Sequence, residues 1–269
     1  MRVGLIQMSA GVAKEDNIAK AIHFVDEAAS SGAKLIVLPE VFVGRGNLHD
    51  KNFRLAVMEP QGGSTFQTFA AKAREWKVWL VLGSILEKGP LSKVYNTQQV
   101  INPKGKLAAK YRKINLFDAK IGDKIIREGD CMAKGQKQQM LEIDGFKTGL
   151  SICYDLRFAK HYDVYRKQNA DVLLAPSCFT KKTGKAHWEV LLRSRAIECL
   201  AYMLAPNQVG IDAKGVEAYG NSMIVDPWGE VQARGSDDKE EIVYGDIDHV
   251  MIEKARDILP GIAGKKHSR

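Results

Sequence analysis

The sequence predicts an α/β fold with mixed β-sheets, and two observations support this prediction. Over residues 3–84, apolar runs and amphipathic segments alternate as strand, helix, strand, helix and strand, which is the rhythm of α/β proteins. Further along, the segments Asn102-Pro103-Lys104-Gly105 and Asp226-Pro227-Trp228-Gly229 each separate two β-like stretches. Turns of this composition are typical of antiparallel hairpins, so the sheets are expected to combine parallel and antiparallel strands.

Apolar periodicity places the first elements. Strands are expected at residues 3–8, 34–38 and 78–84, with helices at about 14–31 and 64–76. The first helix carries its apolar side chains on one face, and Gly32 ends it. Pro39 closes the second strand, so Glu40 falls where a strand end meets a loop.

The rest of the chain follows the pattern less regularly. Strands are expected at residues 94–101, 107–111, 138–143, 146–152, 171–175, 202–205, 222–225 and 230–232, with helices that end near residue 168 and that span Trp188 to Cys199. Residues 180–185 are expected to form a polar loop. Residues 114–135 show no clear periodicity, and a loop of that length is usually functional or disordered. No repeat or linker divides the chain, so we expect one domain over residues 1–269.

Composition and charge limit the classes of protein to which the chain could belong. A hydrophobic content of 45% with 27% charged residues fits an ordinary globular protein. No apolar run is long enough to span a membrane and no signal peptide precedes the first strand, so we expect a cytoplasmic protein. The net charge of +8 raises the question of nucleic acid. The basic residues are spread out, however, with small clusters at 181–182 and 265–269 and no recognisable nucleic-acid motif, so we expect neither a nucleic-acid nor a membrane partner.

Cys153 is the candidate nucleophile among the four cysteines of the chain. None of the four belongs to a CxxC pair or has paired histidines nearby, which argues against a zinc site or a disulfide framework. Cys153 follows a strand and precedes a helix-like segment, where converging backbone N–H groups favour a thiolate and can hold an oxyanion. The alternative is a small buried apolar residue, the usual role of a free cysteine.

Three residues with reactive side chains each lie at the end of a predicted strand, namely Glu40, Lys113 and Cys153. Sites in α/β sheets form at the carboxyl ends of strands, and these three groups make a complete acyl-transfer set. Glu40 can take the thiol proton, Cys153 can attack a carbonyl, and Lys113 can stabilise the oxyanion together with the backbone N–H of Tyr154. Alternatively, Glu40 could cap a helix and Lys113 could belong to a solvated basic edge.

The motifs that surround these residues resemble the nitrilase superfamily of carbon–nitrogen hydrolases, and within it the small amidases similar to ω-amidase and deaminated-glutathione amidase. The resemblance covers nearly the whole chain and depends on five motifs in the order that the family shows. These are Leu38-Pro39-Glu40, residues 111–118, residues 151–158, residues 186–198, and Gly220-Asn221-Ser222 with Asp226-Pro227-Trp228-Gly229.

The resemblance implies a four-layer α-β-β-α sandwich with two mixed β-sheets, no metal and no cofactor. It also implies a homodimer, or a higher homo-oligomer, that associates through a helical face. The Glu-Lys-Cys triad of the family maps onto Glu40, Lys113 and Cys153. The family carries a second active-site glutamate after the lysine, for which Glu128 is the candidate; the alternative is an exposed loop carboxylate.

The predicted function is hydrolysis of a small, carboxylate-bearing amide to acid and ammonia through a cysteine thioester. Arg157 follows the nucleophile closely and could hold the substrate carboxylate with two parallel hydrogen bonds, or it could form a structural ion pair with a nearby acid. His187 is expected to pack at a helix start rather than to act in catalysis. Asn115 replaces a histidine that is frequent in relatives, and Cys178 a smaller residue, so both differences bear on the substrate.

Other readings of the sequence stay open at this point. Within the superfamily, the protein could instead hydrolyse a nitrile or an N-carbamoyl group, or transfer an acyl group. It could be a different cysteine hydrolase that pairs Cys153 with a histidine. It could also be a non-catalytic, basic interaction protein that retains the fold.

Overall fold

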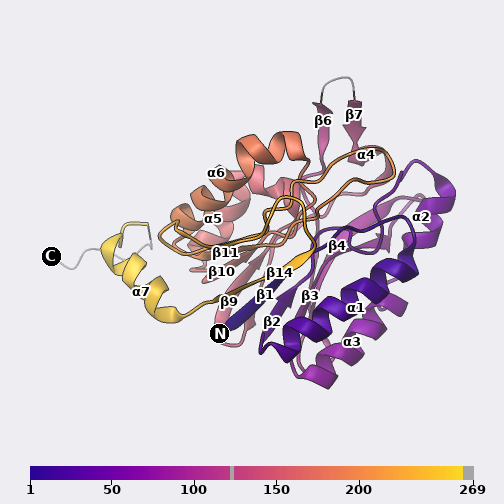
Figure 1. Cartoon of the computed structure of the whole chain (residues 1–269). Helices are drawn as coiled ribbons and strands as arrows, with labels where there is room; N and C mark the ends of the chain where they lie inside the picture. Colours follow the sequence, from indigo (N-terminus) through magenta and orange to yellow (C-terminus); the bar gives the residue numbers. More distant parts are fainter. Residues whose placement is uncertain (122–123, 263–269) are drawn as a thin grey trace.

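The fold is built on two six-stranded β-sheets that pack face to face (Figure 1). The computed structural model describes residues 1–121 and 124–262, so the basic cluster at 265–269 lies outside the described residues. The first sheet has the strand order β14-β1-β2-β3-β4-β5, and the second has the order β13-β12-β11-β10-β9-β8.

Both sheets are mixed, as predicted. The strands of the first are β1 (Arg2–Gln7), β2 (Leu35–Val37), β3 (Trp79–Lys88), β4 (Val94–Ile101), β5 (Leu107–Arg112) and β14 (Glu241–Asp246). The strands of the second are β8 (Gln139–Ile143), β9 (Phe146–Leu150), β10 (Val172–Leu174), β11 (Tyr202–Ala205), β12 (Met223–Val225) and β13 (Val231–Arg234). In each sheet three central strands are parallel, β1-β2-β3 and β9-β10-β11, and the outer strands are antiparallel to their neighbours.

Helices cover the outer face of each sheet (Figure 1). Helices α1 (Lys14–Ser30) and α3 (Ser64–Trp76) lie on the first sheet, and α5 (Ala159–Lys167) and α6 (Lys181–Cys199) lie on the second. The layers therefore follow the order α-β-β-α, and the predicted four-layer sandwich is confirmed.

Strand alternation divides the apolar residues of the first sheet between two clusters. Leu5 and Val37 belong to the large cluster that includes Leu150 and Met203 of the second sheet. Ile6, the neighbour of Leu5, belongs instead to the cluster beneath α1 and α3. This is the expected pattern, because successive side chains of a strand point to opposite faces.

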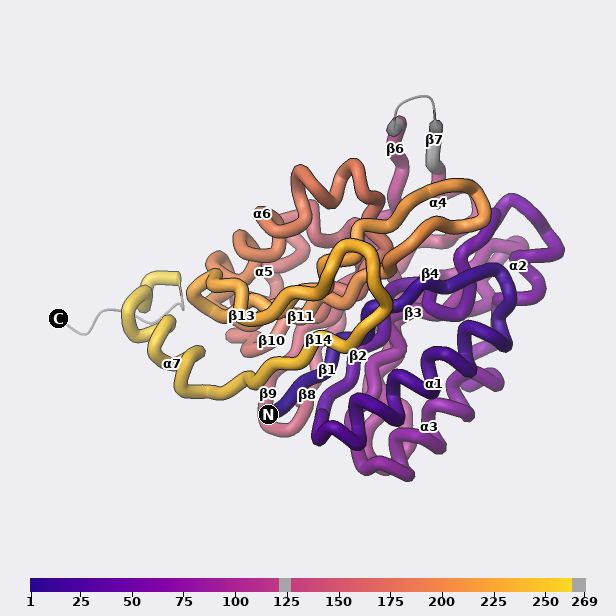
Figure 2. Tube along the Cα trace, viewed as in Figure 1, coloured from indigo at the N-terminus to yellow at the C-terminus, as the bar shows by residue number. Residues whose placement is uncertain are grey.

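The carboxyl-terminal strand returns to the first sheet (Figure 2). β14, drawn in yellow, pairs antiparallel with the indigo β1, with Arg2 opposite Asp246 and Gln7 opposite Glu241. The chain then ends its described part with α7 (His249–Ile258). No helix within 1–121 or 124–262 has the length and apolar character that crossing a membrane requires.

Topology brings three strand ends to one edge of the sandwich. β4 is antiparallel to both β3 and β5, so β5 runs in the same direction as β2 and its carboxyl end lies at the same edge. Lys113 directly follows β5, and Glu40 follows β2 within three residues. Cys153 follows β9 of the facing sheet.

Two local predictions are wrong. Residues 180–185 are not a polar loop, because Thr180 caps α6 and its hydroxyl oxygen accepts the N–H of Thr183 at 3.4 Å. The aperiodic stretch 114–135 is not one long loop either. It contains a hairpin, β6 (Asp118–Ile121) and β7 (Lys124–Arg127), and the short helix α4 (Glu128–Cys131). A further helix, α2 (Lys51–Val57), was not predicted from the sequence; it begins after Asp50, whose carboxylate accepts two backbone N–H groups.

Candidate active site

Cys153 sits at a sharp turn between β9 and a short 3₁₀ helix, η1 (Cys153–Arg157). Its φ of 46° is unusual for a residue with a side chain, because the left-handed region is strained for all but glycine. The backbone N–H of Cys153 donates to the Pro176 carbonyl at 3.0 Å and holds the turn in place. The sequence therefore displays the thiol at the end of a strand, as predicted, on a backbone whose strain is balanced by neighbouring contacts.

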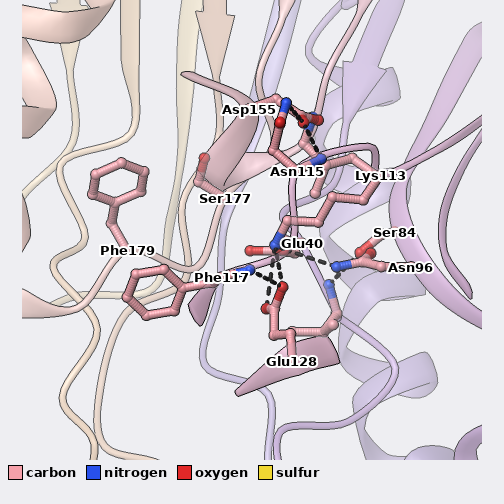
Figure 3. Close-up of polar contacts among 12 residues, drawn as sticks. Glu40, Ser84, Asn96, Lys113, Asn115, Phe117, Glu128, Asp155, Ser177 and Phe179 are labelled. Atoms are coloured by element: carbon pink, nitrogen blue, oxygen red, sulfur yellow. Dashed lines mark hydrogen bonds and ion pairs between the residues drawn. The ribbon is translucent and has the colours of Figure 1, made fainter. Parts of the chain in front are cut away.

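Lys113 forms a buried ion triplet with two carboxylates (Figure 3). Its side chain is fully buried, and Nζ lies 2.8 Å from Glu40 Oε1 and 3.0 Å from Glu128 Oε2. Burial alone would lower the pKa of Lys113, but the charges of Glu128 and Glu40 outweigh it and raise that pKa well above its usual value. The ammonium is therefore permanently charged.

Glu40 is held from several directions. Besides Lys113, Asn96 on β4 donates its Nδ2 to Glu40 Oε1 at 2.8 Å. The backbone of this segment is fixed by Ser84, which accepts the N–H of Val41 at 2.8 Å, and by Gln208, which donates to the Glu40 carbonyl at 2.9 Å. These contacts leave the carboxylate little freedom to turn away from Lys113.

Glu128 is held beside Lys113 by hydrogen bonds to Phe117, which lies just before the β6–β7 hairpin. The backbone N–H of Phe117 donates to Glu128 Oε2 at 2.8 Å, and the Glu128 N–H returns a bond to the Phe117 carbonyl at 3.1 Å (Figure 3). Its side chain is only 19% exposed, so it is not a freely solvated loop carboxylate. Burial and the charge of Glu40 raise the pKa of Glu128, although Lys113 acts in the opposite direction.

The surroundings of Cys153 favour its protonated form, the thiol. Burial, followed by the charge of Glu40, raises the pKa of Cys153 well above its usual value, while Lys113 and the backbone N–H of Cys178 act to lower it. A thiol of this kind becomes a nucleophile only when a base accepts its proton. The Glu40 carboxylate, which lines the same cavity as the thiol and raises its pKa, can be that base.

A cavity of about 320 Å³ opens above these groups. Glu40, Glu128 and Cys153 line its floor, and Lys113 lies beneath them. Aromatic side chains of Phe117, Tyr154 and Phe179 line the walls, with Cys178 nearby. A cavity of this size suits a small molecule.

Arg157 also lines this cavity. Its guanidinium carbon lies 5.2 Å from the ring centre of Phe179 and 5.7 Å from that of Tyr154, and its Nη1 lies 3.1 Å from Nδ1 of His187. Within the described ranges, Arg157 has no carboxylate at ion-pair distance. The structural ion pair considered above is therefore not formed, and the guanidinium faces the cavity with donors to spare.

Sequence reasoning missed the group that ties the lysine and cysteine segments together. Asp155, fully buried in η1, accepts four hydrogen bonds, from Tyr111 Oη at 2.6 Å, Asn115 Nδ2 at 2.8 Å, the Asn115 N–H at 2.9 Å and the Ile152 N–H at 3.0 Å. Figure 3 shows Asp155 and Asn115 facing each other. Asn115 is thus part of this link.

Asn96 was also missed, although the sequence carried a signal for it. Residues 96–99 read Asn-Thr-Gln-Gln inside a strand, and all four are buried. A polar run in the interior of a sheet indicates a buried polar site. As for metals, the structure described for 1–121 and 124–262 contains no group of three or more His, Cys, Asp or Glu side chains arranged to hold an ion.

Comparisons with known proteins give consistent results. A family model described as carbon-nitrogen hydrolase matches residues 2–257. Omega-amidase NIT2 of Homo sapiens is 36% identical over 98% of this chain and 95% of its own length, and deaminated glutathione amidase of Dictyostelium discoideum is 36% identical over 98% and 94%.

Solved structures agree with these matches. Nit3 of Saccharomyces cerevisiae, described as a member of branch 10 of the nitrilase superfamily, superposes with a TM-score of 0.86 at 32% identity and covers 97% of this chain and 94% of its own. The NitFhit protein of C. elegans gives a TM-score of 0.89 at 31% identity over 98% of this chain, which spans only 65% of that longer protein.

We expect Asp155→Asn to destabilise the protein strongly. Each Asp155 oxygen accepts two hydrogen bonds, so either orientation of an amide places an NH₂ group against two donors. Buried donors without an acceptor cost about 1–3 kcal/mol each, and we expect the free energy of unfolding to fall by about 2–4 kcal/mol, measured by urea denaturation.

Two variants serve as controls for this prediction. Tyr111→Phe removes one donor to Asp155 and the acceptor of the Ile114 N–H but leaves the other three donors to Asp155 in place, and it should cost about 1–2 kcal/mol. Asp163→Asn changes an exposed carboxylate on α5 and should leave the denaturation midpoint unchanged. An Asp155→Asn protein as stable as Asp163→Asn would refute the role of Asp155 as a link.

Proposed function

The chain belongs to the carbon–nitrogen hydrolase family, and from this we propose that it is an amidase that hydrolyses a small, carboxylate-bearing amide to the acid and ammonia. One observation carries the proposal: the buried Lys113 ammonium lies between Glu40 and Glu128, beneath a cavity that both carboxylates and Cys153 line. The amide class is supported by the names of the relatives, omega-amidase and deaminated glutathione amidase.

In the first step, Glu40 takes the proton of the Cys153 thiol while the sulfur attacks the amide carbonyl carbon. The raised pKa of Cys153 supports this role, because a thiol with a raised pKa needs a base to accept its proton. The tetrahedral intermediate then expels ammonia, which receives the proton held by Glu40. Protonation of the leaving group matters because an amide nitrogen leaves poorly as an anion.

Lys113 stabilises the oxyanion of the tetrahedral intermediate. An ammonium has three N–H donors. Nζ lies 2.8 Å from Glu40 Oε1, 3.0 Å from Glu128 Oε2 and 3.2 Å from Glu128 Oε1. In the proposal the two Glu128 oxygens share one N–H, so that one donor is left for the substrate oxygen. The backbone N–H of Tyr154, next to the nucleophile, is the second donor in the proposal. Glu128 holds the ammonium in place, since its own carboxylate is fixed by Phe117.

In the second step, water hydrolyses the thioester. Glu40 accepts a proton from the water while the water oxygen attacks the thioester carbon, and the same proton then returns to the Cys153 sulfur as the acid leaves. The reaction consumes one amide and one water and produces one carboxylic acid and one ammonia, with no cofactor.

Arg157 gives the proposal its substrate class. Its guanidinium lines the cavity and has no carboxylate partner within the part of the chain that the structure describes. A substrate carboxylate can supply that partner through two parallel hydrogen bonds. The substrate in the proposal is therefore an ω-amide of a short dicarboxylic acid, with its amide toward Cys153 and its carboxylate toward Arg157.

The proposal includes a homodimer that forms through the outer face of α6. Val190 and Ile197 lie two helical turns apart on α6 and are 64% and 40% exposed, and Trp228, in the β12–β13 turn, is 45% exposed. The turn is fixed to the helix, because Arg193 donates to the Gly229 carbonyl at 2.7 Å. Exposed apolar side chains gathered in this way favour an interface. The predicted cytoplasmic location stays a prediction.

We expect Cys153→Ala to abolish ammonia release from ω-amides while the protein stays folded. The variant loses the nucleophile and little volume. Cys131→Ala, which removes a cysteine from the wall of the same cavity, is the matched control and should retain substantial activity. Ammonia release by Cys153→Ala at a rate near that of Cys131→Ala would show that the nucleophile is assigned wrongly.

Glu40→Gln extends the same experiment to the base. The charge of Glu40 raises the pKa of Cys153, so its removal lowers that pKa and should preserve or speed alkylation of the thiol by iodoacetamide at pH 8. Amide hydrolysis should fall by roughly 10²-fold or more, the scale of general acid–base catalysis. A parallel loss of both reactions would instead indicate a structural role for Glu40.

Arg157→Ala should lower the rate with one substrate and leave the rate with a second one nearly unchanged. For an ω-amide that carries a carboxylate, we expect kcat/KM to fall about 10- to 100-fold, which corresponds to a charged hydrogen bond of about 1.5–3 kcal/mol. For the same amide without the carboxylate, the rate should change little. Arg74→Ala, an exposed arginine on α3, should affect neither substrate. An equal loss for both substrates would mean that Arg157 supports the site structurally.

The dimer can be tested by analytical ultracentrifugation. We expect the wild-type protein to sediment as a dimer and the double variant Val190→Glu/Ile197→Glu as a monomer, because two buried charges oppose association. Val12→Glu, at a residue that is 52% exposed just before α1, should leave the dimer intact. A wild-type monomer, or a double variant that remains dimeric, would contradict this interface.

A further inference from the structure

A second cavity, of about 290 Å³, lies on the other side of β5 from the candidate active site. Four of its lining residues are cationic, namely Lys110, Arg112, Lys134 and Lys137, and none is acidic. The other lining residues are Tyr95, Gly135, Gln136 and Gln139. We propose that this basic cavity binds a small, soluble anion that carries phosphate groups.

In the part of the chain that the structure describes, Glu87 is the one carboxylate paired with these cations. It is buried below the cavity and accepts hydrogen bonds from Lys110 at 3.0 Å, from Arg112 at 2.7 Å and from Thr97 at 2.9 Å. Burial would raise the pKa of Glu87, but the hydrogen bonds from Arg112, Lys110 and Thr97 lower it, so Glu87 stays ionised. One negative charge against four positive charges leaves an excess of three at a concave surface.

Arg112 is fixed in a geometry suited to an oxyanion. Its guanidinium carbon lies 3.8 Å from the ring centre of Tyr95, and its Nε and one Nη2 hydrogen are engaged by Glu87. A guanidinium has five N–H donors, so the remaining donors stay available on a group whose orientation is already set. A preorganised guanidinium loses little conformational freedom when it binds.

Lys134 and Lys137 bring two further charges from the segment that connects α4 to β8. Both are exposed, and the described ranges contain no ion-pair partner for either. The segment itself is rigid, because the Gly135 N–H donates to the Lys113 carbonyl at 2.8 Å and the Ala133 N–H donates to the Val94 carbonyl at 2.8 Å. Gly135 is required there, since a Cβ would lie 1.9 Å from the Arg112 carbonyl oxygen.

The size and shape of the cavity identify the class of anion. Nucleic acid needs an extended basic track or stripe, whereas these four cations surround one compact cavity. A phosphate group carries up to two negative charges and several acceptor oxygens, and pairs with both guanidinium and ammonium groups. A diphosphate would neutralise the excess charge and fit within the cavity.

The test is isothermal titration calorimetry of the full chain with inorganic pyrophosphate. We expect saturable binding to the wild-type protein, and a loss of affinity of at least about tenfold in the double variant Lys134→Gln/Lys137→Gln, the scale of one charged hydrogen bond. Both lysines are exposed, so the variant should fold normally. Sulfate at equal ionic strength should not reproduce the binding.

The matched control is Lys104→Gln/Lys106→Gln, which removes the same charge from two exposed lysines of the β4–β5 turn. It should bind pyrophosphate as the wild-type protein does. Three results would each overturn the proposal: no saturable binding to the wild-type protein, an equal loss in both double variants, or equal binding of sulfate. Because the readout is binding rather than turnover, this result is independent of the amidase assignment.

Discussion

The buried ammonium of Lys113 is the constraint on which the candidate active site depends. Removing an ammonium from water costs several kcal/mol unless opposite charges and hydrogen bonds compensate. Here Glu40 and Glu128 supply that compensation from two different parts of the chain. The ion triplet therefore requires the end of β2, the end of β5 and the β6–β7 hairpin to meet at one point. Two carboxylates around one cation also leave an excess negative charge, and the charge of Glu40 adds to burial in raising the pKa of the neighbouring Cys153 thiol.

A second constraint joins the two sheets. The strained turn at Cys153 persists because its neighbours hold it, and Asp155 contributes most directly by bonding to Tyr111 on β5 and to Asn115 just beyond it. A short series of hydrogen bonds thus connects the segment that carries the Cys153 nucleophile to the segment that carries the Lys113 ammonium. Catalytic groups held in this way need little rearrangement during the reaction, which is the basis of electrostatic preorganisation.

The parts of the structure that depend on local pattern could be predicted from the sequence, and the parts that depend on tertiary contacts could not. The alternation of strands and helices predicts the α/β class, and the motif resemblance predicts the layer order. Both signals consist of residues that are close together along the chain. The start of α6 was misjudged, since Thr180 and the lysines after it look like a polar loop until the cap is seen. Asn96 and Asp155 act on residues 56 and 44 positions away, and no local pattern specifies such partners. That the chain forms one domain stays a prediction.

The alternation of side chains along β5 explains how one strand serves two different electrostatic environments. Tyr111 is buried toward the second sheet, and Lys113, two residues further on, is equally buried and paired with two carboxylates. Lys110 and Arg112 point to the opposite face, remain partly exposed and share the single carboxylate of Glu87. Since successive residues of a strand face opposite sides, the basic run Lys110-Tyr111-Arg112-Lys113 is divided between an interior where two carboxylates surround Lys113 and a positively charged exterior. The alternative of a solvated basic edge treats the four residues together, whereas the sheet separates Lys113 from Lys110 and Arg112.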